Sequence, residues 1–177
     1  MKKLIIAFAC LLCVLNSNAQ VRLGGSILID AKKMKGAEVS EGNSSLKLEG
    51  GYALNEKWEI ALGIGFTSRT NENGIKDFGN RSDFFLNPYV RYTFAKVDAL
   101  SFYVDAAFQE TLNTTKNQDA QPDFWVGLRL GLKYQLSDKF VLVSQLGQWG
   151  FREVKDAYSQ VGLDLSNGLS FGLYYSF

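Results

Sequence analysis

The residues of this chain that could do acid–base chemistry are carboxylates and amines, because the sequence contains no histidine. Without an imidazole, the usual general base near neutral pH is missing and Ser-His-Asp catalysis is excluded. A pair such as Lys47 and Glu49, or Glu59 alone, could in principle transfer protons. Ion pairing explains the same residues more simply, so we expect no catalytic residue and no enzyme.

Metal and cofactor chemistry has equally little support in the sequence. The only cysteines, Cys10 and Cys13, lie in an apolar segment near the start of the chain. The acidic residues between the periodic segments, such as Glu38, Glu41, Asp77 and Asp119, lack the spacing of a Ca²⁺ loop. We therefore expect no metal site and no cofactor.

The segments that carry the charged residues alternate between apolar and polar side chains. The longest examples are Lys57–Ser68 and Phe124–Leu136. A period of two over this length predicts β-strands, because successive side chains of a strand point to opposite faces. Six further segments show the pattern less regularly, which makes eight strands in all: Val21–Ala31, Ser44–Leu54, Asp83–Ala95, Leu100–Thr111, Lys139–Phe151 and Tyr158–Phe177.

Two of these segments are irregular. In the seventh, Val141 and Val143 oppose Phe140 and Leu142, so the facing of that strand stays open. In the fourth, Pro88 cannot donate a hydrogen bond to a neighbouring strand, and we expect a bulge or local kink there.

The last segment, Tyr158–Phe177, could be two strands joined at Ser166–Gly168. Its apolar residues keep one parity from Val161 to Phe177. This regularity favours one long strand.

The connections between the segments alternate in length. Short turns are expected at Asn55–Glu56, around Lys96–Asp98 and at Ser137–Asp138. Longer polar loops are expected at Lys32–Asn43, Arg69–Arg81 and Leu112–Gln121. Short turns on one side and long loops on the other are typical of transmembrane barrels, whose turns face the periplasm. The predicted fold is all-β: a single closed, eight-stranded, antiparallel, transmembrane up-and-down barrel.

Charged residues and glycines share one face of the predicted strands. An eight-stranded barrel has a narrow lumen, which could not hold the large apolar side chains of the other face. The apolar face is therefore expected to meet lipid, and the charged face to line the lumen. Enclosed charges are costly unless paired, so we expect ten residues to form an ion-pair network: Arg22, Lys47, Glu49, Glu59, Asp83, Arg91, Asp105, Arg129, Lys133 and Asp164.

Aromatic residues occur at the two ends of the apolar faces, with aliphatic residues between them. Amphipathic rings are most stable at the two interfaces of a bilayer. We predict two aromatic girdles that contain Trp58, Phe66, Phe84, Tyr92, Phe94, Phe102, Phe108, Phe124 and Tyr134.

The C-terminus carries a further pattern, in which Ser170, Gly172, Tyr175 and Phe177 fit polar, any, Gly, any, any, aromatic, any, aromatic. The pattern resembles the outer-membrane β-signal, and the whole mature chain resembles the small barrels of the OmpX type and the transmembrane domain of OmpA. The resemblance implies closed antiparallel topology, termini at the periplasm and insertion by the barrel assembly machinery. It does not carry a function, because members of this architecture do different things.

The first 19 residues predict export. Lys2 and Lys3 precede an apolar run from Leu4 to Leu15 that is too short to span a bilayer as a helix, and Ala19 precedes a suitable cleavage site. We expect residues 1–19 to be a cleaved signal peptide and residues 20–177 to be one barrel domain, exported through the Sec pathway to the outer membrane. Loss of the two lysines leaves 17 of the 19 basic residues against 18 acidic ones, which gives no basis for binding nucleic acid.

For function, the sequence favours a non-enzymatic outer-membrane protein that supports envelope integrity or displays polar loops. Two alternatives stay open: a narrow channel or carrier for small solutes, and an enzyme that acts on envelope lipid. The expected partners are outer-membrane lipid, lipopolysaccharide and the assembly machinery, with the protein itself a monomer.

Overall fold

The computed structural model describes residues 20–33, 40–71, 81–113, 123–154, 158–164 and 170–177. These residues form strand segments only, all of them antiparallel to their neighbours. Within these ranges, no helix is long and apolar enough to cross a membrane. The segments are β1 (Val21–Lys33), β2 (Ser40–Ala53), β3 (Trp58–Asn71), β4 (Arg81–Val97), β5 (Leu100–Asn113), β6 (Asp123–Gln135), β7 (Phe140–Val154), β8 (Tyr158–Asp164) and β9 (Ser170–Ser176).

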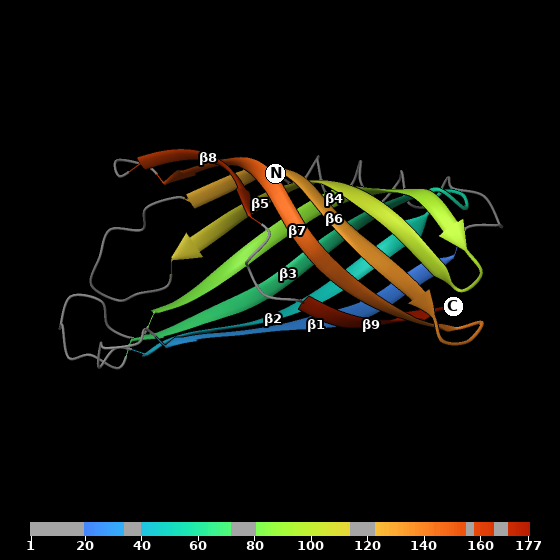
Figure 1. The fold of residues 1–177 in the computed structure, drawn as a ribbon, viewed down its shortest axis with the longest axis horizontal. Helices are drawn as coiled ribbons and strands as arrows, with labels where there is room; N and C mark the ends of the chain where they lie inside the picture. Colours follow the sequence, from blue (N-terminus) through green and yellow to red (C-terminus); the bar gives the residue numbers. More distant parts are fainter. Residues whose placement is uncertain (1–19, 34–39, 72–80, 114–122, 155–157, 165–169) are drawn as a thin grey trace, which may run out of the picture.

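The strands close into a barrel. From β1 to β7 each strand pairs with the next one along the chain, and β9 pairs with both β7 and β1. Both β8 and β9 lie along β7, so they share the last of eight strand positions. Figure 1 shows these strands inclined to the long axis of the barrel. Closure satisfies the backbone of each of these strands on both sides, which a strand protein needs inside a bilayer.

The last strand is not continuous, and the prediction of one long strand is wrong. In the pairing of β7 with β9, Gln145 lies opposite Ser170. The same register would place residue 167 opposite Gln148, but the partner of Gln148 is Asp164. The chain thus changes register between β8 and β9. Its parity survives the change, because Val161 and Leu163 of β8 point outward, as do Phe171 and Leu173 of β9.

Short turns connect the strands at the end of the barrel where the C-terminus lies (Figure 1). Between β2 and β3, the side-chain oxygen of Asn55 accepts hydrogen bonds from the backbone N–H groups of Lys57 and Trp58. Between β4 and β5, Asp98 adopts a φ of 51°, which aspartate tolerates better than most residues. Between β6 and β7, the Ser137 hydroxyl accepts from Phe140 N–H. The three predicted turns are confirmed.

At the other end the strands continue beyond the alternating segments of the sequence. The β1–β2 ladder reaches Lys33 opposite Ser40, and the β2–β3 ladder reaches Glu41 opposite Asn71. The predicted loops are therefore too long. Alternation marks the part of a strand that has lipid on one face, whereas backbone pairing continues where both faces are polar.

A bulge explains the irregular seventh strand. The pairing of β6 with β7 shifts register at Leu146, which is the extra residue on β7. Before the bulge, Val141 and Val143 face inward and are buried, at 3% and 6% exposure. After it, Trp149 faces outward and Arg152 reaches a lumen partner. The facing that the sequence left open thus changes within the strand.

Pro88 causes no shift of register, so the expected bulge is absent, but the β4–β5 pairing is interrupted at Asn87 and Pro88. The β4–β5 pairings on either side of it share one register, which places Pro88 opposite Phe108. The Asn87 side-chain amide donates to the Phe108 carbonyl at 2.7 Å and supplies the hydrogen bond that proline cannot give. The register shift of β4 lies instead at Phe94, between Thr93 and Ala95.

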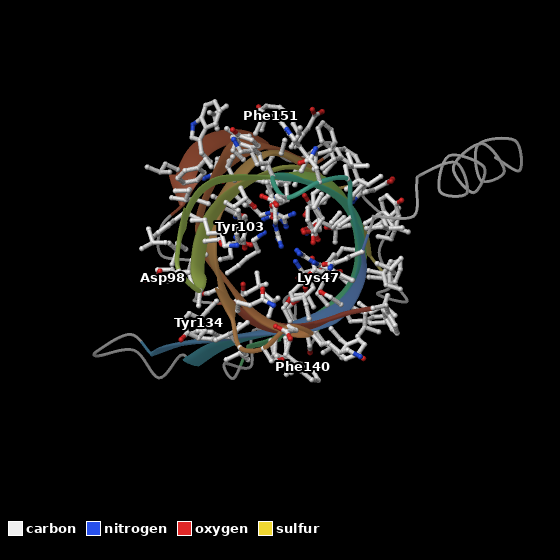
Figure 2. All side chains as sticks on the ribbon, turned by 90° about the vertical axis from the view of Figure 1, so that its right-hand side faces the viewer. Lys47, Asp98, Tyr103, Tyr134, Phe140 and Phe151 are labelled. Carbon is white, nitrogen blue, oxygen red and sulfur yellow. The ribbon has the colours of Figure 1, made fainter. Side chains whose placement is uncertain are left out.

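The two faces of the wall differ in chemistry. Most of the large side chains that point outward are apolar, for example Leu62, Leu128 and Leu130. Buried polar and charged residues point inward. In the view along the barrel, Lys47 and Tyr103 lie inside the ring of strands, and Phe140 and Phe151 lie outside it (Figure 2).

Candidate functional site

The lumen is organised by a row of opposite charges that crosses four neighbouring strands. Glu59 of β3 lies opposite Arg91 of β4, which lies opposite Asp105 of β5, which lies opposite Arg129 of β6. Directly opposite residues of antiparallel strands are within side-chain contact, so the alternating signs attract. All four residues point into the barrel, so the row follows the inner face of the wall from β3 to β6.

Arg91 and Asp105 form the most enclosed pair of the row. The Nε and Nη2 groups of Arg91 donate to the two oxygens of Asp105 at 2.7 and 3.0 Å. The two side chains are only 4% and 5% exposed. The Arg91 guanidinium also lies over the ring of Tyr103, 3.9 Å from its centre. Bidentate geometry and burial make such a pair both strong and sensitive to the loss of one partner.

A second cluster lies where the barrel closes. Glu49 of β2 accepts a hydrogen bond from the Tyr174 hydroxyl of β9 and pairs with Lys47 at 2.8 Å. Tyr174 reaches Glu49 across β1, over Gly24, where an added Cβ would be 2.6 Å from the ring. The glycine leaves the space that the tyrosine ring occupies, and the cluster ties β2 to β9.

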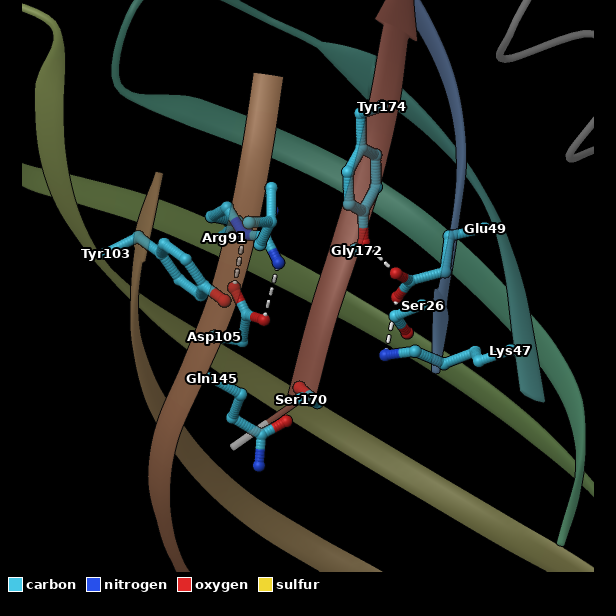
Figure 3. Close-up of a pocket in the computed structure, with 11 residues that line it drawn as sticks. Ser26, Lys47, Glu49, Arg91, Tyr103, Asp105, Gln145, Ser170, Gly172 and Tyr174 are labelled. Atoms are coloured by element: carbon cyan, nitrogen blue, oxygen red, sulfur yellow. Dashed lines mark hydrogen bonds and ion pairs between the residues drawn. The ribbon is translucent and has the colours of Figure 1, made fainter. Parts of the chain in front are cut away.

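A small polar cavity separates the two clusters. Arg91 and Asp105 line one side of it, and Lys47, Glu49 and Tyr174 line another (Figure 3). The space accommodates about one water molecule.

Smaller contacts lie farther from this centre. Arg22 pairs with Glu59 at 2.9 Å, Lys133 donates to the Thr93 hydroxyl at 2.9 Å, and Arg152 binds Asp123. Asp123 and Arg152 were not among the predicted lumen residues. Asp123 precedes the segment in which alternation is clear, and Arg152 follows the bulge of β7.

Six of the ten residues predicted for the lumen network form three ion pairs: Arg22–Glu59, Lys47–Glu49 and Arg91–Asp105. Lys133 binds a hydroxyl instead of an acid. Arg129 faces the lumen but has no acidic partner among the described residues; its guanidinium instead lies 5.3 Å from the Tyr89 ring and 5.8 Å from the Trp125 ring. Asp105 lies opposite Arg129 on β5, but both of its carboxylate oxygens accept hydrogen bonds from Arg91. Asp83 is buried near the loop end of β4. Asp164 pairs through its backbone with Gln148, and its side chain lies outside the described part of the chain.

Aromatic side chains form two rows on the outer surface. At the turn end, Trp58 contacts Tyr92, with ring centres 4.6 Å apart, and Phe94 neighbours Phe102 at 6.3 Å. Tyr134 is also exposed near this end. At the loop end, the rows contain Phe66 with Phe84 at 5.2 Å and Phe108 with Phe124 at 6.2 Å. The rows include all nine predicted girdle residues. They lie eight residues apart along β3, roughly 20 Å along the barrel axis at typical strand rise and tilt.

Comparison with protein families matches residues 4–177 to the outer membrane protein beta-barrel domain family. The chain belongs to this family. Its outer-membrane location follows from the family and from the inverted arrangement of the two faces of the wall.

A solved structure, that of Neisserial surface protein A, shows the same fold as this outer-membrane barrel. Neisserial surface protein A is 16% identical, with a TM-score of 0.54 over 91% of this chain and 98% of that one. The N-terminal barrel domain of Pseudomonas aeruginosa OprF is 17% identical, with a TM-score of 0.49 over 90% and 98%. Yersinia pestis Ail is 15% identical, with a TM-score of 0.49 over 90% and 98%. A comparison with curated protein sequences finds no match.

The residues of the predicted assembly signal lie in β9 and just after it. Tyr175 and Phe177 point outward, with ring centres 4.9 Å apart, and Gly172 faces inward. Ser170 begins the strand. In this folded outer-membrane barrel β9 is paired on both sides, so its role as a signal concerns the chain before closure and stays a prediction.

Sequence reasoning left four inward aromatic residues out of the lumen, although they share the parity of the charged residues in their segments. These residues are Phe85, Tyr89, Tyr103 and Tyr174. The Arg91 guanidinium lies over the rings of Tyr89 and Tyr103, and the hydroxyls of Tyr103 and Tyr174 donate hydrogen bonds. The alternation of Phe124–Leu136 did place Trp125 on the charged face.

The charged side chains inside this outer-membrane barrel mainly form ion pairs. Among the described residues, no group of three or more acids, histidines or cysteines could hold a metal ion. The acids Glu49, Glu59, Asp105 and Asp123 each face a cationic partner. Three of these ion pairs join different strands, and the Lys47–Glu49 pair lies within β2.

Proposed function

We propose that this outer-membrane barrel is a non-enzymatic envelope protein: its ion-paired lumen makes a stiff wall, and the polar segments between its strands contact molecules at the cell surface. The observation that carries the proposal is the engagement of the lumen carboxylates. Four acids are held by cations of other residues, two of them with bidentate geometry. A general acid or base needs a carboxylate that is free to exchange a proton with substrate, and a paired, enclosed one is poorly suited to that task.

The outer surface supports lipid and lipopolysaccharide as its partners. Aliphatic residues lie between two aromatic rows, which is the arrangement that a bilayer favours. We further propose export through the Sec pathway, insertion by the barrel assembly machinery and a monomeric state. Pairing of β1–β7 and β9 on both sides supports a barrel that needs no partner chain to satisfy its strand edges.

A test of the proposal combines two measurements on the same protein. Planar bilayers containing the purified barrel should show no reproducible conductance steps, and lipid A from cells with and without the gene should have the same mass. Conductance steps would favour a channel or carrier, and a mass change would favour an enzyme that acts on envelope lipid. Either result would overturn the proposal.

The envelope role itself is tested in cells. Deletion of the gene should increase sensitivity to detergent, and the intact gene should restore resistance. A variant in which residues 34–39, 72–80 and 114–122 are replaced by Gly-Ser segments of equal length separates the two parts of the proposal. Restoration by this variant assigns the role to the barrel wall, and failure, with normal amounts in the outer membrane, assigns it to the surface segments.

A further inference from the structure

Two cations of the described lumen have no acidic partner: Lys133, which donates to the Thr93 hydroxyl, and Arg129, whose Nε and Nη2 atoms are buried without a partner. Glu49, Glu59, Asp105 and Asp123 hold Lys47, Arg22, Arg91 and Arg152 respectively. Asp83 lies near the far end of β4, away from the row that contains Arg129. Arg129 therefore has no acidic side chain to bind within the described lumen.

Arg129 is nevertheless deeply enclosed. The residue is 5% exposed, and its Nε and Nη2 atoms are buried without a hydrogen-bond partner among the described residues. Asp105 lies opposite it on β5, but both oxygens of Asp105 accept from Arg91. The residue opposite it on β7 is Gln148, which carries no charge. A buried, unpaired guanidinium is unfavourable and calls for a counter-ion.

The unpaired edge of the Arg129 guanidinium consists of its Nε and Nη2 groups. Arg91 uses these two groups to bind the two oxygens of Asp105. Arg152 uses the same edge for the two oxygens of Asp123. This edge presents two parallel N–H groups that match the spacing of carboxylate oxygens. Among the described lumen arginines, Arg91 and Arg152 fill this edge with a carboxylate, Arg22 binds Glu59 through Nη1 instead, and Arg129 alone has no carboxylate at all.

We propose that Arg129 is a binding site for the carboxylate of a small organic acid inside the barrel. The Tyr89 hydroxyl also lacks a partner, and its ring lies 5.3 Å from the Arg129 guanidinium, so it is suited to donate a further hydrogen bond to the ligand. The inference is independent of the envelope role proposed above, because a barrel that conducts nothing can still hold an acid.

Trp125 is the side chain that reports on this site. Its ring lies 5.8 Å from the Arg129 guanidinium and over Gly127 and Gly150, where an added Cβ would be 2.8 Å from the ring. Because Arg129 is enclosed, a ligand at its Nε and Nη2 groups displaces this ring or the ring of Tyr89. The other tryptophans, Trp58 and Trp149, are 44% and 52% exposed on the outer surface. Replacing them by phenylalanine leaves Trp125 as the sole tryptophan fluorophore.

The experiment uses this Trp58→Phe, Trp149→Phe protein, purified from outer membranes in zwitterionic detergent. Sodium acetate is titrated against sodium chloride and sodium phosphate at equal ionic strength. Acetate should change the Trp125 fluorescence in a saturable way, and with an affinity about tenfold or more above that of chloride, which cannot occupy both N–H groups as a carboxylate does. Arg129→Lys keeps the charge but loses the two parallel N–H groups and should weaken acetate binding about tenfold or more. Lys133→Met, which removes another lumen cation, should leave acetate binding unchanged.

Several results would overturn the proposal. These are no saturable change with acetate, an equal response to chloride, tighter binding of phosphate than of acetate, and unchanged binding in Arg129→Lys. If Arg129→Lys does not give the heat-modifiable band of a folded barrel, the Nε–H resonances of the unsubstituted protein are followed by NMR instead. The Arg129 resonance must then move with acetate while those of Arg91 and Arg152 stay in place; a stationary Arg129 resonance rejects the site.

Discussion

Replacement of Arg91 by methionine should be among the most destabilising single changes in the lumen. Methionine has a similar length, so packing is largely kept while the charge and two hydrogen bonds to Asp105 are lost. The Asp105 carboxylate would then remain buried, at 3% exposure, without its cation. Loss of one partner of a buried ion pair costs about 3–5 kcal/mol. Loss of the stacking on Tyr103 adds about 1–2 kcal/mol where the contact is desolvated.

The assay is urea unfolding of the barrel from lipid vesicles, followed by the heat-modifiable band on a gel. Arg152→Met is the matched control, because Arg152 also binds an acid with the same edge but its side chain is 35% exposed. Solvent screening around Arg152 should reduce the cost of that change to about 1–3 kcal/mol, which is not zero because the Asp123 side chain is only 8% exposed. The double variant Arg91→Met, Asp105→Leu removes the unpaired charge and should recover most of the stability lost in Arg91→Met.

Two results would refute this reasoning. One is a loss of stability in Arg91→Met that matches the loss in Arg152→Met, since the argument requires burial to separate them. The other is a double variant whose loss of stability equals the sum of the losses in Arg91→Met and Asp105→Leu measured separately. Additivity would mean that the two residues do not interact.

Three further changes test other parts of the structure. Tyr174→Phe removes the hydroxyl that ties the closing strands together and should cost about 1–3 kcal/mol in the same urea assay, whereas Tyr175→Phe on the outer surface should cost almost nothing; equal effects would argue against the contact. Gly131→Ala places a Cβ 2.3 Å from the Tyr103 ring and should cost about 1–3 kcal/mol, whereas Gly50→Ala, whose Cβ would be 3.6 Å from the Leu23 side chain, should be tolerated. Leu128→Arg puts a charge on the lipid face between the aromatic rows and should cost about 2–4 kcal/mol in vesicles; an unchanged midpoint of unfolding would contradict the lipid-facing assignment.

Much of the fold could be predicted from the sequence because period-two alternation reports both a strand and its two faces. Lys57–Ser68 shows this best, since its predicted apolar face is the outer face of β3. The loop ends of the strands could not be predicted in the same way. Beyond the bilayer both faces are polar, so nothing in the sequence separates a paired strand from a loop.

Bulges were the second source of error. A single extra residue, such as Leu146, reverses the facing of every later residue in its strand, and no residue type announces it. Pro88 looked like a bulge but is accommodated by the Asn87 amide. The register change between β8 and β9 was hidden because it preserves parity.

The candidate site was predictable in its composition but not in its pairing. Parity placed the charged residues in the lumen, yet which acid binds which cation depends on the register between strands. Arg129 illustrates this point, because its neighbour Asp105 binds Arg91 instead. Which of the two arginines binds Asp105 depends on side-chain geometry, and the alternation of residue types in the sequence does not contain that information.

Spin labels placed on single cysteines can show directly which face of the wall meets lipid. No cysteine occurs after Cys13, so single variants are easily made. In lipid vesicles, labels at Leu62, Leu128 and Leu130 should collide frequently with dissolved oxygen and rarely with a polar nickel complex. Labels at Ser26, Lys133 and Gln145 should show much lower oxygen accessibility. Equal accessibility at the two sets, or the reverse order, would contradict a barrel with lipid outside and ion pairs within.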